Sequence, residues 1–239
     1  GRHGGAVLPD SLRWLWRDHV VGPIQQEQKK VDAAQVFEER SVVFSGGEYQ
    51  QETFQYRLLK PQSTEQPQPL VVFLHGAGER GVDNKLQLLY LPELLAQPHS
   101  RERFPCYVLA PQCRPDRKWV NVDWSAPGDP EMPAEPSEQL QVVMQMLEKT
   151  LAEENIDRSR IYLTVLSMGG FGSWDLAIRK PDLFAAISPI CGAADPKRIG
   201  ILAQHPVWMV HGDGDTVVLP DRSRSAAAAL RQAGGQPVY

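Results

Sequence analysis

Residues 161–171 read Ile-Tyr-Leu-Thr-Val-Leu-Ser-Met-Gly-Gly-Phe, and they contain the most informative local pattern of the chain. Its first part, Ile161–Leu166, is a short apolar run rich in β-forming residues, which predicts a strand buried on both faces. The glycines that follow permit a tight turn into a helix that starts near Phe171. A buried strand that turns directly into a helix is typical of a parallel sheet between helical layers.

The same pattern recurs along the chain. Similar apolar runs predict further strands at Leu70–Leu74, Tyr107–Ala110 and Val207–Val210, with an additional candidate at 185–190. Upstream, Ser41–Phe44 and Thr53–Leu59 flank a Ser-Gly-Gly turn and predict an antiparallel pair. Strands that alternate with helices predict an α/β fold with a mostly parallel, doubly wound sheet.

One helix between these strands is expected over 137–154. Ser137 can cap it, and one face collects Leu140, Val143, Met144, Leu147 and Leu151. The proline-rich stretch 125–136 that precedes it predicts a surface loop.

The N-terminal part divides into two segments. Residues 1–21 predict one amphipathic helix, because Leu8, Leu12, Leu15 and Trp16 recur at helical spacing. Residues 22–40 are polar with few apolar anchors and are expected to be a linker. The main domain is therefore expected to cover 41–239.

The bulk composition excludes several classes of protein. Hydrophobic residues make up 42% and charged residues 23%, an ordinary globular balance. A formal charge of -4 without a basic stripe argues against nucleic acid as a partner. No apolar run is long enough to span a membrane. Three cysteines without metal-ligand spacing argue against a zinc site; Cys106 and Cys113 can pair or can be two small buried residues.

The turn after the 161–166 strand carries a candidate nucleophile, Ser167. Acyl transfer from a serine needs its hydroxyl held out on a strained strand-to-helix turn with small neighbours, and Gly169 meets that need. The usual pattern is G-x-S-x-G, and Val165 departs from it at the first glycine. The alternative is a glycine-rich turn whose serine only caps the helix.

A glycine-rich loop, His75–Gly81, directly follows the 70–74 strand. A tetrahedral oxyanion needs two backbone N–H donors, and we assign them to Ala77 and to Met168. The supporting residues are His75, Gly76, Gly78 and Gly169, with His75 expected to be a structural hydrogen-bonding residue rather than a base. Such a loop would also suit phosphate, but it lacks the Gly-Lys-Ser/Thr ending of a P-loop.

The third strand end carries two aspartates, in the stretch His211–Val218. A catalytic triad needs a carboxylate to orient its histidine, on the loop after a late strand. We prefer Asp215 to Asp213 for this role, although either can be a turn-forming residue.

With these residues in view, 41–239 resembles the phospholipase/carboxylesterase and predicted-peptidase branch of the α/β-hydrolases, near the dienelactone hydrolases and polyhydroxybutyrate-depolymerase-like esterases. The matching stretches are VVFLHGAGERG, DRSRIYLTVLSMGGFGSWDLAIRKPDLFAAISPICG and WMVHGDGDTVV. The resemblance implies an α/β-hydrolase fold with Ser167 as nucleophile and Asp215 as acid. It also implies a small-molecule or polymer-linked ester as substrate and no metal or organic cofactor.

The pattern breaks at the histidine, because none follows Asp215. The chain order Ser, Asp, His therefore predicts a missing C-terminal segment that carries the base. Residues 1–21 resemble the last histidine loop and closing helix of an enterochelin-esterase-like hydrolase, which implies two hydrolase domains in tandem. The alternatives are a circular permutation in which His3 completes the triad, and an ordinary N-terminal helix.

These observations predict a serine hydrolase that cleaves carboxylic esters through an acyl-enzyme on Ser167. Two alternatives stay open: a non-catalytic binding domain of the same fold, and a serine peptidase. Without its base, this stretch of chain is expected to hydrolyse esters weakly or not at all. The sequence does not specify the acyl group or the compartment.

Overall fold

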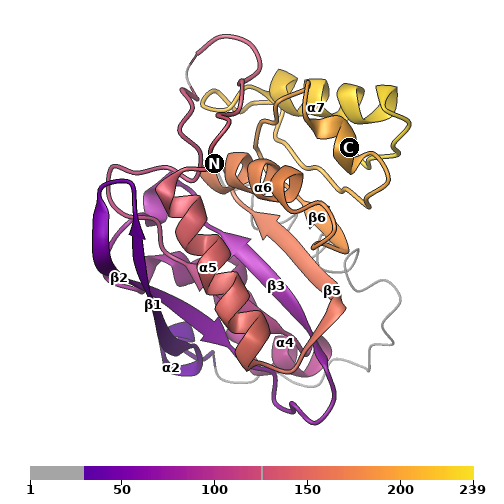
Figure 1. Cartoon of the computed structure of the whole chain (residues 1–239). Helices are drawn as coiled ribbons and strands as arrows, with labels where there is room; N and C mark the ends of the chain where they lie inside the picture. The colour runs from indigo at the N-terminus through magenta and orange to yellow at the C-terminus, as the bar shows by residue number, and fades with distance from the viewer. Residues whose placement is uncertain (1–29, 125) are drawn as a thin grey trace.

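The computed structural model describes residues 30–124 and 126–239, and these contain a six-stranded sheet with the order β1-β2-β4-β3-β5-β6 (Figure 1). The strands are β1 (Glu38–Gly46), β2 (Tyr49–Leu59), β3 (Gln68–Leu74), β4 (Tyr107–Pro111), β5 (Ile156–Val165) and β6 (Ala186–Ser188).

The centre of the sheet is parallel, as the sequence predicted. Strand β3 pairs in parallel with β4 and β5, and β5 pairs in parallel with β6. The hairpin of β1 and β2 adds an antiparallel edge that joins the sheet at β4. In the 207–210 run, Val207 and Val210 make isolated parallel bridges to Ile187 and Ile190, so this segment continues the sheet without forming a full strand.

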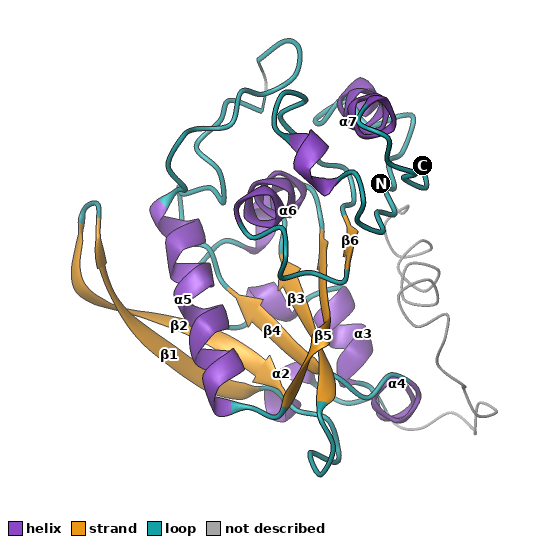
Figure 2. Cartoon of the chain, turned by 45° about the vertical axis from the view of Figure 1, so that its right-hand side comes forward, coloured by secondary structure: helices purple, strands orange, loops and turns teal. Residues whose placement is uncertain are grey.

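Helices cover both faces of this sheet (Figure 2). They are α2 (Ala33–Val36), α3 (Leu91–Ala96), α4 (Pro98–Arg103), α5 (Glu138–Glu153), α6 (Met168–Arg179) and α7 (Pro220–Gln232), with 3₁₀ turns η1 (Ala77–Glu79), η2 (Leu86–Leu88) and η3 (Ile199–Leu202).

Strand β3 shows how the two faces are filled. Its side chains alternate: Leu70, Val72 and Leu74 join the core cluster that contains α5, α6 and α7, whereas Val71 and Phe73 join the cluster that contains α2 and α3. Because both faces are buried, the strand reads as a continuous apolar run. The expectation of a strand buried on both sides is confirmed.

Helix α5 begins where the sequence placed it. The Ser137 hydroxyl accepts a hydrogen bond from the Leu140 N–H at 3.1 Å and donates one to the Trp119 carbonyl at 2.7 Å. The cap therefore also fixes the loop that precedes the helix. In the predicted apolar face, Leu140, Val143 and Leu147 are buried, and Met144 and Leu151 are half-buried. No helix or strand is present over 126–136, the described part of the predicted loop.

The ordered fold begins earlier than the expected boundary at Ser41. Ala33 and Phe37 are buried in the core, and β1 starts at Glu38. Residues 30–40, expected to be a linker, are thus part of the domain. The amphipathic helix expected over 1–21 and the rest of the linker, 22–29, lie outside the described residues.

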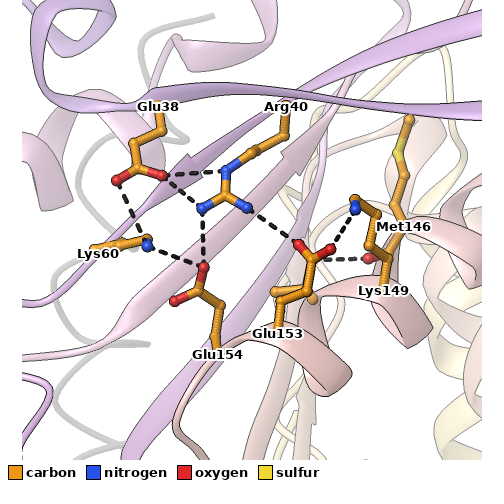
Figure 3. A network of polar contacts seen from close by, with 8 residues as sticks. Glu38, Arg40, Lys60, Met146, Lys149, Glu153 and Glu154 are labelled. Carbon is orange, nitrogen blue, oxygen red and sulfur yellow. Dashed lines mark hydrogen bonds and ion pairs between the residues drawn. The ribbon is translucent and has the colours of Figure 1, made fainter.

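An ion-pair network fastens β1 to the end of α5 (Figure 3). The Arg40 guanidinium contacts Glu38 at 2.7 Å, Glu153 at 3.2 Å and the half-buried Glu154 at 2.9 Å. Lys60 of the β2–β3 loop reaches the same Glu154 carboxylate at 3.0 Å. The network lies at the amino ends of β3 and β5, away from the edge where ligands bind in such sheets.

Two further features bear on expectations from the sequence. Cys106 and Cys113 are free and buried at the two ends of β4. Among the described helices, none is long and apolar enough to cross a membrane.

Candidate active site

Ser167 occupies a strained turn between β5 and α6. Its backbone has φ 55 and ψ -113, a conformation that side-chain-bearing residues rarely adopt. The Ser167 N–H donates to the Ile190 carbonyl at 2.9 Å, and its carbonyl accepts from Gly170 N–H at 2.6 Å. The strain is thus held by backbone hydrogen bonds on both sides of the serine.

Val165 does not prevent this turn from forming. It is the last residue of β5, where it pairs with Leu74 of β3 and has its side chain fully buried in the core. A β-branched residue suits that extended position, because the sharp bend comes two residues later.

Two glycines bring the start of α6 against the sheet. A Cβ at Gly169 would lie 2.0 Å from the carbonyl oxygen of Leu74, and a Cβ at Gly170 would lie 2.5 Å from the Cα of Gly192. Neither position can hold a side chain without movement of backbone. Gly169 therefore presses the nucleophile turn onto the end of β3, and Gly170 presses it onto the loop after β6.

His75 is the first residue of the loop after β3, and hydrogen bonds at both ring nitrogens fix its side chain. Its Nε2 accepts a hydrogen bond from the Cys113 N–H at 2.9 Å, so Nδ1 carries the proton that it donates to the Gly76 carbonyl at 2.6 Å. Burial lowers the His75 pKa to about 4. The His75 carbonyl accepts from Trp119 Nε1–H at 2.9 Å. His75 thus has a structural role, and neither ring nitrogen is free to act as a base.

The loop after β3 passes directly beside Ser167. A Cβ at Gly76 would lie 3.6 Å from the Ser167 Cβ, and a Cβ at Gly78 would meet nothing within 4 Å. Ala77 and Met168 are the first residues of η1 and α6, so their N–H groups have no partner inside those helices. The two residues predicted as oxyanion donors therefore each begin a helical turn with a free N–H position.

The same loop carries a buried carboxyl group, Glu79, which was not among the site residues predicted from the sequence. Glu79 is 8% exposed, and its Oε2 has no hydrogen-bond partner among the described residues. That oxygen lies 3.0 Å from the point where a Gly76 Cβ would be. Burial raises the Glu79 pKa.

The two aspartates after the Val207–Val210 segment have different surroundings. Asp215 Oδ1 accepts hydrogen bonds from Val217 N–H at 2.9 Å and Val218 N–H at 3.0 Å, which fix its carboxylate. Asp213 is exposed and pairs with Arg224 at 2.8 Å. The surroundings of Asp215 thus fit the role of a triad carboxylate better than those of Asp213.

Cys191, in the loop after β6, is affected by both Ser167 and Asp215. Burial raises the pKa of its thiol to about 11, the negative charge of Asp215 raises it as well, and a hydrogen bond from the Ser167 backbone lowers it. Its φ of 49 places it on a second strained turn. The Ser167 N–H donates to the Ile190 carbonyl and the Cys191 N–H donates to the Val210 carbonyl, both at 2.9 Å, so the loop after β6 connects the Ser167 turn with the segment that leads to Asp215.

His211 lies beside Asp215 but does not reach the serine. Its side chain is 0% exposed, and Nε2 is 3.5 Å from Asp215 Oδ2. Its Nδ1 contacts the Ser223 hydroxyl at 2.6 Å, and Nε2 contacts the Val218 carbonyl at 2.7 Å. Both nitrogens are occupied, which excludes His211 as the base in this arrangement.

None of the other described histidines contacts Ser167 either. His205 bonds to the Pro181 carbonyl at 2.6 Å, and His99 lies 3.3 Å from the Ser100 hydroxyl. The base expected after Asp215 is thus not found within 30–124 or 126–239, and His3 lies outside those ranges. Within the same ranges, no group of three or more His, Cys, Asp or Glu side chains could hold a metal ion.

Two residues of α6, Trp174 and Asp175, lie within a stretch that matches the resemblance. Trp174 is fully buried in the core. Asp175 accepts from Arg179 Nε–H at 2.9 Å and lies 3.9 Å from Arg198.

Comparison with solved structures identifies the fold. The chain superposes on a thermostable esterase with a TM-score of 0.76 and 37% sequence identity, over 86% of this chain and 54% of that one. The chain has the α/β-hydrolase fold. It also superposes on a ferulic acid esterase from Anaeromyces mucronatus, with a TM-score of 0.59 over 91% of this chain and 87% of that one. The identity there is 14%, which shows the fold alone.

A curated relative of the chain is poly(3-hydroxyalkanoate) depolymerase C from Paucimonas lemoignei. It is 32% identical over 125 residues, which is 52% of this chain and 28% of the depolymerase. The chain thus spans about half the length of the thermostable esterase and less of the depolymerase. No family model matches the sequence.

Proposed function

We propose that this protein is a serine ester hydrolase in which Ser167 is the nucleophile and Asp215 is the acid. The observation that carries the proposal is the strained backbone of Ser167, φ 55, held between the glycine-rich loop after β3 and the loop after β6. Strain of this kind persists where the surrounding structure imposes it, often at catalytic positions. The 37% identity to an esterase supports the same activity.

The reaction follows from these positions. The Ser167 hydroxyl attacks the ester carbonyl while a histidine takes its proton, and the N–H groups of Ala77 and Met168 stabilise the oxyanion. Asp215 orients that histidine. The alcohol leaves with the proton from the histidine, and water then releases the acid from the acyl-enzyme by the same route.

The histidine comes from outside the described residues. The Ser, Asp, His order of this fold favours a position after Tyr239, in a second segment of the hydrolase domain. The resemblance of 1–21 to the end of another hydrolase domain supports two domains in tandem. The coding sequence beyond Tyr239 tests this: a histidine in a glycine-containing loop, followed by a closing helix, supports the proposal. If no such histidine follows, His3 becomes the remaining candidate.

The substrate is a carboxylic ester, either small or linked to a polymer. The relatives that support this are an esterase and a poly(3-hydroxyalkanoate) depolymerase. Acylaminoacyl peptidases share the fold at 18% identity, which gives no support for peptide cleavage. A p-nitrophenyl ester and a peptide p-nitroanilide, assayed side by side, separate the two activities.

The test uses a fluorophosphonate probe on the full-length protein. Wild-type protein should be labelled and Ser167→Ala should not. Asp215→Asn should lower kcat by about 10³–10⁴-fold, as expected for loss of a triad carboxylate. The matched control is Asp213→Asn. This aspartate is exposed and pairs with Arg224, so the substitution should leave kcat unchanged. Labelling that survives Ser167→Ala contradicts the proposal.

A further inference from the structure

His211, the histidine beside Asp215, has a hydrogen-bond partner at each ring nitrogen. The Val218 carbonyl only accepts hydrogen bonds, so His211 Nε2, 2.7 Å away, carries a proton and donates it. In the neutral ring Nδ1 then accepts from the Ser223 hydroxyl at 2.6 Å. With its side chain 0% exposed, His211 is fully committed to protein contacts.

Each of these contacts bears on the Asp215 carboxylate. Val218 donates its N–H to Asp215 Oδ1 at 3.0 Å and accepts from His211 through its carbonyl. His211 Nε2 itself lies 3.5 Å from the other oxygen, Asp215 Oδ2. The ring thus bonds the same residue, Val218, whose N–H bonds the carboxylate, and Nε2 also lies beside the carboxylate itself.

Ser223 connects this arrangement to the nucleophile turn. Its hydroxyl, on the first turn of α7, has a second acceptor within reach, the carbonyl of Gly192 at 3.2 Å, and its single proton serves one of the two acceptors at a time. Gly192 in turn lies against Gly170 of α6, so closely that a Cβ on either would meet the other's backbone within 2.6 Å. A continuous set of contacts therefore runs from Asp215 through His211 and Ser223 to the helix that begins after Ser167.

We propose that His211 and Ser223 are positioning residues that set the place of the Asp215 carboxylate relative to Ser167. The inference rests on the proposed function, since it assigns Asp215 the part of the triad acid. It also explains why a histidine next to the acid is not the base. The His211 ring supports the loop that carries Asp215, and the carboxylate stays available to a second histidine.

The experiment compares three variants of the full-length protein. Ser223→Ala removes the hydroxyl that His211 and Gly192 share. Ser225→Ala is the matched control, because it lies on the same helix and its hydroxyl contacts Asp129 instead. His211→Gln keeps an amide donor that can reach the Val218 carbonyl and loses the contact with Ser223.

Two measurements are sensitive to the position of the Asp215 carboxylate. Hydrogen exchange of the Val217 and Val218 amides, which both donate to Asp215 Oδ1, should be about tenfold faster in Ser223→Ala and unchanged in Ser225→Ala. For ester hydrolysis, Ser223→Ala and His211→Gln should lower kcat about tenfold with KM unchanged, at a temperature where all variants are folded.

The outcomes separate this inference from the proposed function. Unchanged amide exchange in Ser223→Ala and His211→Gln overturns the inference. Loss of labelling in His211→Gln as complete as in Ser167→Ala also overturns it, because His211 would then be the base. If wild-type protein is not labelled while the amides respond as expected, the ester hydrolase proposal fails and the support of the acid loop by His211 stands.

Discussion

Gly169→Ala tests the close approach of the nucleophile turn to β3. A Cβ at this position would lie 2.0 Å from the Leu74 carbonyl oxygen, 2.7 Å from its carbon and 3.1 Å from the His75 carbonyl oxygen. Real Cβ atoms essentially never approach closer than 3.0 Å, so α6 and β3 must separate by about 1 Å. All three atoms belong to backbone, which leaves no side-chain rotation to relieve the contact.

The magnitudes follow from that displacement. Overpacking costs about 1–3 kcal/mol, and alanine in a helix gains about 1 kcal/mol over glycine, so the free energy of unfolding should fall by up to about 2 kcal/mol. Displacement of Ser167 by about 1 Å from the loop after β3 should slow acylation about 10²-fold. Helix propensity alone would give the opposite sign for stability.

The assay measures urea unfolding and the rate of fluorophosphonate labelling in the same preparations. Gly200→Ala is the control, because its Cβ would meet only the Ala233 Cβ, at an ordinary 3.4 Å, and it should change neither quantity appreciably. Gly169→Ala protein with wild-type stability and wild-type labelling would refute the argument that this glycine sets the distance between the two elements.

Three further predictions concern the surroundings of the site and the far edge of the sheet. Trp119→Phe removes the donor to the His75 carbonyl, 2.9 Å away, and should lower the free energy of unfolding by about 1–3 kcal/mol in urea titrations; no change would mean that water replaces the indole N–H. The His75 pKa of about 4 lies below its ordinary 6.5, so the unfolded chain binds a proton that the folded ring does not, and stability is complete above pH 6.5 and declines as pH falls to about 4. This difference is worth about 3 kcal/mol, and urea titrations at pH 7 and pH 4.5 should show it in wild type and not in His75→Gln; equal pH dependence would contradict it. Arg40→Met leaves the half-buried Glu154 with Lys60 as its remaining cation and should cost about 1–2 kcal/mol by the same measurement, whereas a neutral result would place the network among surface ion pairs of little worth.

The sequence predicted the parallel centre of the sheet and the tight strand-to-helix turn at Ser167 because both depend on local pattern. A run buried on both faces, such as Leu70–Leu74, has few alternatives once helices flank it. The 207–210 run was expected to be a strand of the same kind, and it forms only isolated bridges. Pro189 has no N–H to donate, so the ladder between β6 and this run is interrupted where the two would pair.

Features that depend on distant contacts could not be predicted in this way. The fold begins before Ser41 because Ala33 and Phe37, four residues apart in a polar stretch, reach the core next to α3. The contact of His211 with Ser223 spans 12 residues and a loop, and no spacing rule anticipates it. The burial of Glu79 likewise depends on the fold of the loop rather than on its composition.

The strained backbone of Ser167 also bears on how this chain would change if the hydroxyl had no use. A positive φ costs a residue with a side chain roughly 1–3 kcal/mol, and glycine adopts it freely. Drift in a chain that served only to bind a partner would therefore favour glycine at position 167, because that replacement stabilises the fold at no functional cost. A serine at φ 55 is what selection for the hydroxyl would leave behind.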